Sequence, residues 1–95
     1  NLYRCKSFEQ WKLAADKGDA LAQSQVGVYF EKGKGVEKSL ESAFYYYQLA
    51  ANQQEVLGLI HLADFFAEGK GVKQSHQEAR DYYQLAADLQ EPYAQ

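Results

Sequence analysis

The chain has 95 residues, of which 46% are hydrophobic and 24% are charged, and its formal net charge at pH 7 is -3. This composition is typical of an ordered soluble domain and argues against intrinsic disorder. The acidic balance argues against nucleic-acid binding, which normally needs a basic excess on one face. The longest apolar stretches are too short to cross a bilayer, so we expect no membrane insertion.

The cysteine content and the first residues say little about the compartment. Cys5 has no second cysteine with which to form a disulfide inside the chain. The first residues lack a methionine, a basic segment and an apolar segment, so they do not resemble a signal peptide. We interpret residues 1–95 as a single domain that is a fragment of a longer array, and the sequence leaves its localisation unknown.

A repeat organises the chain from its first helix onwards. Residues 11–16 (WKLAAD) match residues 47–52 (YQLAAN), and twelve of the nineteen residues from 33 to 51 recur 36 positions later. Repeats of about 20–50 residues predict stacked units that cover one another's apolar faces. We therefore expect a partial repeat at 1–18, full repeats at 19–54 and 55–90, and a stub at 91–95.

Two helical patterns alternate within each repeat. In the first, called helix A, apolar and small residues recur at three- and four-residue spacing, at 22, 23, 26, 27 and 30 and again at 58, 59, 62, 63 and 66. Helix A is predicted to end at Gly33 and Gly69, and the second glycine of each Gly-Lys-Gly loop permits another unusual turn. The small residues Gly27 and Ala63 indicate that a neighbouring helix approaches closely.

The second pattern, called helix B, occupies positions 43, 46, 47, 50 and 51 and recurs at 79, 82, 83, 86 and 87. Ser39 and Ser75 are its predicted N-caps. Glu78 completes a capping box with Ser75, whereas Ser42 offers Ser39 no such partner, so the first B helix is predicted to be less sharply defined. Of three consecutive tyrosines, only Tyr45 is expected to be exposed, because successive helical residues point in different directions.

These residues together carry a resemblance to a known family. They are Ala22-Gln23, Val26-Gly27 and Phe30 in helix A, Gly33-x-Gly35-Val36 in the loop, and Ala43, Tyr46-Tyr47 and Ala50-Ala51 in helix B. The pattern resembles the Sel1-like repeats, which are relatives of the tetratricopeptide repeats. The resemblance implies an all-α, right-handed superhelix of about two and a half repeats, with A helices on the concave side and B helices on the convex side. It also implies a role in holding other proteins or peptides.

The chain departs from the family pattern in three ways. Glu37-Lys38 and Lys73-Gln74 stand where proline and aspartate are usual. Gln54 and Gln90 replace the usual glycine between helix B and the next helix A. Glutamine at positive φ costs on the order of 1 kcal/mol, so these turns are expected to take another geometry. The disulfides of the cysteine-rich members cannot form here.

Rotation along helix A places a second set of residues on a face that the packing positions leave free. This face mixes chemical types and differs between the repeats, as expected of a recognition surface, although a merely solvated face would look the same. Tyr29 and Phe65 beside it recur at one slot and are predicted to be core. The candidate partner-binding residues are Leu21, Ser24, Val28, Glu31 and Lys32 in the first repeat, and Leu57, Ile60, Asp64, Ala67 and Glu68 in the second.

No catalytic residue, cofactor or metal site is predicted. His61 and His76 lie on different elements without other ligands at metal-binding spacing, the Gly-Lys-Gly loop lacks the spacing of a P-loop, and no serine lies in a nucleophile motif. We therefore expect a non-catalytic scaffold or adaptor that binds a protein or peptide through helix A. The alternatives are a hydrolase or penicillin-binding activity, as suggested for disulfide-rich relatives, and a purely structural spacer.

Two further expectations concern the stack. Equivalent residues such as Tyr47 and Tyr83 should have matching environments. Phe8 and Trp11 should present uncovered apolar surface, and residues 92–94 should begin a helix that they cannot finish. The chain is therefore predicted either to associate end to end or to occupy its own groove at high concentration.

Overall fold

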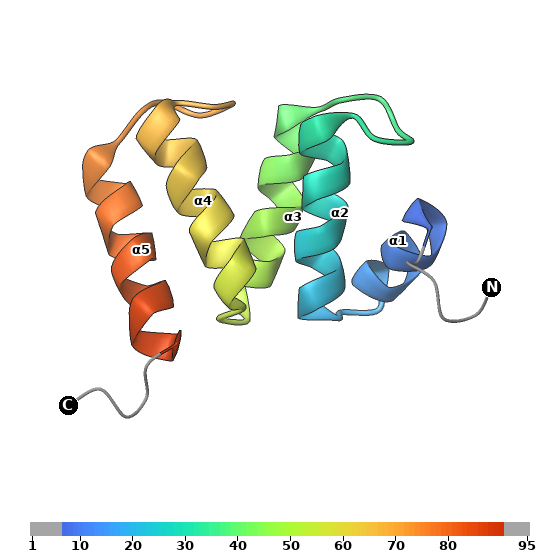
Figure 1. Ribbon diagram of the computed structural model, residues 1–95, viewed down its shortest axis with the longest axis horizontal. Coiled ribbons are helices and arrows are strands. Elements are labelled where there is room, and N and C mark those ends of the chain that lie inside the picture. The colour runs from blue at the N-terminus through green and yellow to red at the C-terminus, as the bar shows by residue number, and fades with distance from the viewer. Residues whose placement is uncertain (1–6, 91–95) are drawn as a thin grey trace.

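The computed structural model describes residues 7–90 of the chain. Within this range all regular structure is helical and no strand is present, which confirms the predicted all-α class (Figure 1). The five helices are α1 (Phe8–Asp16), α2 (Ala20–Lys32), α3 (Leu40–Asn52), α4 (Val56–Glu68) and α5 (His76–Gln90).

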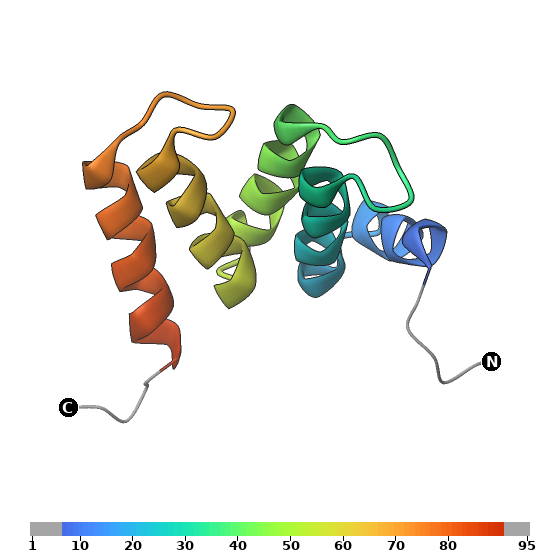
Figure 2. The ribbon, with the colours of Figure 1, turned by 45° about the horizontal axis from the view of Figure 1, so that its top comes forward.

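The helices form one row in chain order, as both views show (Figures 1 and 2). Each helix packs against the next, and α2 also touches α4 across the stack. In the terms used above, α2 and α4 are A helices and α3 and α5 are B helices, while α1 precedes the first A helix. The row is elongated, with principal extents of 42 × 33 × 19 Å.

Glycines end both A helices, as the sequence predicts. Gly33 and Gly69 adopt φ values of 67° and 70°, and their N–H groups donate to the carbonyls of Tyr29 and Phe65. This left-handed conformation satisfies free carbonyls of the last helical turn, and glycine adopts it without a Cβ clash. Gly35 also has a positive φ, of 78°. The two loops therefore share one backbone path between helix A and helix B.

Both B helices begin at the predicted serine N-caps. The predicted difference between the two caps, a capping box at Ser75 and none at Ser39, is absent. The Ser39 and Ser75 hydroxyls accept hydrogen bonds from the backbone N–H groups three residues later. The N–H of Ser75 donates to the carbonyl of Phe66 at 2.8 Å and that of Ser39 to Phe30 at 2.9 Å. In a capping box the side chain of Glu78 would accept a hydrogen bond from the N–H of Ser75. That N–H instead donates to the Phe66 carbonyl of helix A, so the predicted capping box is wrong.

The turn between α3 and α4 contradicts the expectation for Gln54. This residue adopts a φ of 62°, where Gly18 in the equivalent turn has 103°. The neighbouring Gln53 joins the two turns, because its Nε2 donates to the Gly18 carbonyl at 2.9 Å and to Gln23 Oε1 at 3.0 Å. A strained residue persists where surrounding contacts hold it, and this bridge between turns supplies such contacts.

The core runs between the helices along the whole row. Most of the predicted packing positions of α2, α3 and α4 are buried, including Ala22 and Val26 in α2 and Leu59 and Leu62 in α4, whereas Tyr83 and Ala87 of α5 are exposed. Its centre is Tyr47, which is fully buried and packs edge-on against Phe65 with ring centroids 5.4 Å apart. Phe65 is itself buried, which confirms the prediction that it is a core residue.

Close helix contacts explain the small residues of the A helices. A Cβ built on Gly27 would lie 2.4 Å from Tyr47 Cε1, and one built on Gly58 would lie 2.7 Å from Ala50 Cβ. Both glycines therefore let α3 approach the flanking A helices, as the sequence predicts for Gly27.

The N-terminal end of the row is better covered than expected. Phe8 is half-buried and packs edge-on against Tyr29 and Phe30, with ring centroids 5.7 and 5.6 Å apart. Trp11 is half-buried in the same cluster. The exposed apolar residue of α1 is instead Leu13, which is 59% exposed. Residues 92–94 lie outside the described range, and end-to-end association stays a prediction.

Candidate partner-binding surface

The structure distributes the candidate residues over three levels of exposure. Leu21 and Leu57, one repeat apart, are 44% and 40% exposed. Lys32 and Glu68 are also exposed, at the C-terminal ends of α2 and α4. The half-buried candidates are Val28, Glu31, Ile60, Asp64 and Ala67, and Ser24 is buried.

Ser24 does not belong to the surface. It is 1% exposed, and its hydroxyl donates a hydrogen bond to Oε1 of Glu55. The same oxygen caps α4 by accepting from the Gly58 N–H at 2.9 Å. The sequence prediction for Ser24 is wrong because α4 packs on this side of α2, so the hydroxyl joins two repeats and is not free for a partner.

Val28 and Ile60 lie at the edge of the core. Both are half-buried and pack against the cluster that contains Tyr47. Their side chains therefore stabilise the stack and leave only part of their surface for a partner. Tyr45 on α3 is 57% exposed, whereas Tyr46 and Tyr47 are buried, as predicted.

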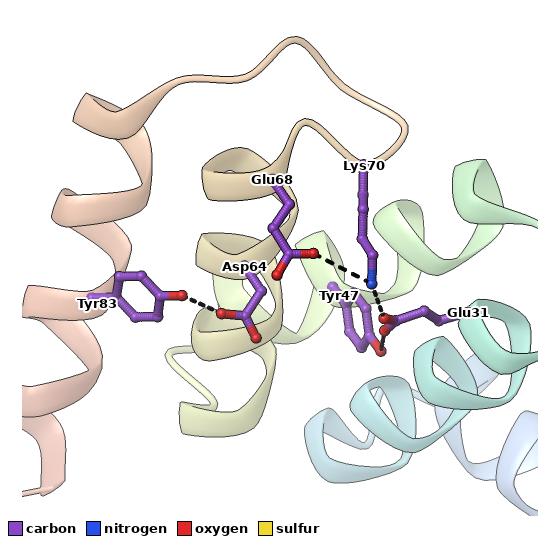
Figure 3. A network of polar contacts seen from close by, with 6 residues as sticks. All are labelled: Glu31, Tyr47, Asp64, Glu68, Lys70 and Tyr83. Atoms are coloured by element: carbon purple, nitrogen blue, oxygen red, sulfur yellow. Dashed lines mark hydrogen bonds and ion pairs between the residues drawn. The ribbon is translucent and has the colours of Figure 1, made fainter.

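Glu31 is the centre of a polar network that joins two repeats (Figure 3). Its Oε1 accepts a hydrogen bond from the Tyr47 hydroxyl at 2.7 Å, and its Oε2 lies 2.8 Å from Lys70 Nζ. Lys70 also lies 3.7 Å from the Glu68 carboxylate and 5.7 Å from the centroid of the Phe65 ring. The network thus links α2, α3 and the loop after α4.

The network shifts the pKa values of its members. Burial alone would raise the pKa of Glu31, but the bonds from Lys70 and Tyr47 outweigh it, and the pKa lies below its ordinary value. The bond to Glu31 raises the pKa of Lys70. Burial and the bond to Glu31 raise the pKa of Tyr47. Glu31 is therefore an anion at neutral pH, and much of its charge is already balanced by Lys70.

Replacing Lys70 by methionine is expected to raise the pKa of Glu31 from its lowered value, because the cation that opposes the burial effect is lost. A lowered folded-state pKa stabilises the fold above the unfolded pKa of about 4.3, and this stability is lost as pH falls through the folded value. The variant should therefore lose less stability on acidification than the wild type. Carboxyl-carbon NMR titration of Glu31 and urea unfolding between pH 3 and 7 measure both effects.

Lys34 provides the matched control, because it is the equivalent lysine of the first Gly-Lys-Gly loop and is exposed. A Lys34→Met variant should leave the titration of Glu31 unchanged. If both variants shift it equally, the ion pair is not the cause.

Tyr83 differs from Tyr47, although the repeat predicts matching environments. Tyr47 is fully buried, whereas Tyr83 is 40% exposed and donates to Asp64 of α4 (Figure 3). The bond to Asp64 and then burial raise the pKa of Tyr83 to about 12. The prediction of equal surroundings is wrong because α4 covers Tyr47, and no described helix follows α5. Each tyrosine still bonds to a carboxylate of the A helix in its own repeat.

The sequence prediction missed Lys70, Tyr47 and Tyr83 as members of polar contacts. The sequence features that could have pointed to these residues are the repeated Gly-Lys-Gly loop, which contains Lys70, and the repeated tyrosine pair, which contains Tyr47 and Tyr83. Spacing along one helix could not reveal them, because Lys70 and Glu31 are 39 residues apart and meet only through stacking.

Other kinds of site find no support in the described range. No group of three or more His, Cys, Asp or Glu residues within 7–90 could hold a metal ion. None of the helices that the structure describes is long and apolar enough to span a bilayer.

Comparison with known proteins assigns the family. A model of the Sel1 repeat matches residues 20–55 and again residues 56–91. The chain belongs to the Sel1 repeat family. Sel1 repeat proteins are in general scaffolds for protein–protein interaction. No curated protein matches the chain.

Solved structures of Sel1 repeat proteins share the fold. A Sel1 repeat protein from Oxalobacter formigenes is 33% identical with a TM-score of 0.83, over 85% of this chain and 33% of that one. The c5321 protein, described as a protective antigen of uropathogenic Escherichia coli with an SLR fold, is also 33% identical with a TM-score of 0.83. That match covers 86% of this chain and 18% of the other. The chain thus spans a third or less of each structure, and the likeness confirms the predicted right-handed α-solenoid.

Proposed function

We propose that the chain is a non-catalytic scaffold that binds a protein or peptide through the exposed side of its A helices, α2 and α4. Ser24 is left out because it is buried. The proposed surface consists of Leu21, Val28, Lys32, Leu57, Ile60, Asp64 and Glu68, with Glu31 and Ala67 at its inner edge.

The exposed leucines are the observation that carries the proposal. Leu21 and Leu57 occupy equivalent positions in successive repeats, and both keep a large apolar side chain in water. Further along the same helices, Lys32 in one repeat is replaced by Glu68 in the next. A pair of apolar anchors at one end of the two helices, with differing charges at the other end, suits recognition of one particular partner, since apolar contacts supply affinity and charges select the partner.

Three serines have structural roles, which supports a function without catalysis. Ser39 and Ser75 cap α3 and α5, and Ser24 is buried against Glu55. These hydroxyls are therefore engaged in structural hydrogen bonds. Turnover of an ester or a β-lactam that a single Ser→Ala change abolishes would contradict the proposal.

Peptides selected from a random display library on the wild-type chain should lose at least about tenfold in affinity on a Leu21→Asp/Leu57→Asp variant. Burying a leucine contributes about 1.5–3 kcal/mol, and 1.4 kcal/mol is tenfold in affinity. Fluorescence anisotropy with a labelled peptide gives the dissociation constants. The variant should fold normally, because both side chains are exposed.

A Leu13→Asp variant is the matched control, since Leu13 is an equally apolar and more exposed residue on α1. Its affinity should equal that of the wild type. Equal loss in both variants would contradict the assignment to α2 and α4, and a library that yields no binder would favour the spacer.

A further inference from the structure

The exposed leucines of the A helices lie on a face that a following repeat leaves open. The first A helix shows this, because both α3 and α4 pack against α2. Leu21 is nevertheless 44% exposed, and Lys32 at the other end of α2 is exposed as well. Leu57 and Glu68 are the equivalent residues of α4, 36 positions later. The exposure of these positions is therefore a property of each repeat.

The two A helices differ in charge at their C-terminal ends. Helix α2 ends with Lys32, whereas α4 has no basic residue in its last turn and carries Asp64 and Glu68 there, four residues apart. Like charges at this spacing repel each other, and the C-terminal end of a helix is already the negative end of its dipole. The end of α4 is thus an unfavourable place for two carboxylates, and an added cation would stabilise it.

The neighbouring residues supply that cation only in part. Lys70 Nζ lies 2.8 Å from Glu31 Oε2 but 3.7 Å from Glu68 Oε1, so its closer partner is Glu31 (Figure 3). The Tyr83 hydroxyl donates to Asp64 but brings no charge. The side chain of Glu68 is 60% exposed. The end of α4 therefore keeps negative charge that is open to solvent.

A short peptide can span the distance from the exposed leucine of α4 to this charge. Leu57 and Glu68 are eleven residues apart in the helix, which corresponds to about 16 Å. Short segments do not form stable helices in water, and an extended segment covers this length with about five residues.

We propose that the A-helix surface binds an extended segment of a partner protein in which lysine or arginine stands about five residues from an apolar residue. This inference rests on the partner-binding role proposed above for α2 and α4, and it names the chemistry of the partner. The apolar residue packs on Leu57 and on the equivalent Leu21 of α2, and the cation lies against Asp64 and Glu68. An acidic segment is rejected because it meets like charge at the end of α4.

A peptide display library tests the charge with the 95-residue chain. Every peptide carries one leucine, and a position about five residues away is lysine, glutamate or glutamine in equal proportion. Selection should enrich lysine. When each selected peptide is made again with glutamate at that position, fluorescence anisotropy should show about fivefold weaker binding, and high salt should reduce the difference. Equal affinities, or a preference for glutamate, would overturn the proposal.

Two variants of the chain with the same change of charge locate the effect. Glu68→Lys should reverse the preference, and Lys32 shows that lysine is accepted at the equivalent helix end. Glu37→Lys, in the loop after α2, is the matched control, because Lys73 occupies that position in the next repeat. The control should keep the preference for lysine. A preference that Glu68→Lys leaves unchanged, or that both variants reverse equally, would overturn the proposal.

A neutral variant separates this inference from the proposed function. Leu21→Gln/Leu57→Gln removes the apolar contacts without changing the charge, and it should weaken every selected peptide. Peptides that depend on the leucines but bind equally with lysine and glutamate would overturn the charge assignment alone. Peptides that bind this variant as tightly as the wild type, or a library without any binder, would contradict the proposed function and this inference with it.

Discussion

Replacing Tyr47 by alanine is expected to lower the free energy of unfolding by about 3–5 kcal/mol, the range for large aromatic residues in well-packed cores. The side chain is fully buried and contacts both repeats, through Phe65 and His61 on α4 and through Gly27 on α2. The change would leave a cavity at the centre of the stack and would remove a donor from Glu31. Urea unfolding followed by circular dichroism at 222 nm measures the loss.

Tyr83→Ala is the matched comparison for this prediction. Tyr83 is the same residue one repeat later, but it is 40% exposed, and no helix among residues 7–90 covers it as α4 covers Tyr47. Its replacement should cost roughly 1–2 kcal/mol, since less surface is buried and the cavity opens to water. Equal costs at the two positions would show that the repeats stack differently from the structure described above.

Gly27→Ala is expected to destabilise the protein by about 2 kcal/mol, although alanine is the better helix former. The added Cβ would lie 2.4 Å from Cε1 and 2.6 Å from Cδ1 of the Tyr47 ring. Overpacking of this kind costs about 1–3 kcal/mol and occasionally more, and a contact this short belongs at the upper end. The gain in helix propensity of about 1 kcal/mol offsets only part of the cost. A thermal midpoint lowered by roughly 8–16 °C would follow for a domain of this size.

Two controls separate the clash from the general effect of the substitution. Ala63 is the equivalent residue of α4, already carries a Cβ and is fully buried, so Ala63→Gly should cost about 1 kcal/mol in helix propensity and about 0.8 kcal/mol for the lost buried methyl group. In the double variant Gly27→Ala/Tyr47→Ala the clash is absent, and the two losses should sum to more than the measured effect. Additive losses would contradict the proposed contact.

The sequence predicted local structure well because its causes are local. Gly33 and Gly69 end the A helices, and Ser39 and Ser75 begin the B helices, each through contacts within a few residues. The buried positions of helices A and B follow in the same way from spacing on a 3.6-residue helix.

The candidate surface was predicted less well, for reasons that spacing cannot capture. Ser24 was placed on the free face, but its partner Glu55 lies 31 residues away in the next repeat. Gln54 was expected to avoid positive φ, but the bridge from Gln53 to Gly18 and Gln23 holds the turn in that conformation. Both errors concern contacts between repeats.

The sequence by itself determined the A and B helices, the glycines that end the A helices, the serines that begin the B helices, the 36-residue repeat and the family, because each depends on residue type and on spacing along the chain. Only the tertiary structure decided which polar side chains join the repeats and which remain free. Glu31 became a junction with Tyr47 and Lys70, whereas Arg80 stayed unpaired among the residues described. The physical reason is that such pairs depend on the distance between packed helices, and that equivalent positions in two repeats differ in exposure once a neighbouring helix covers one of them.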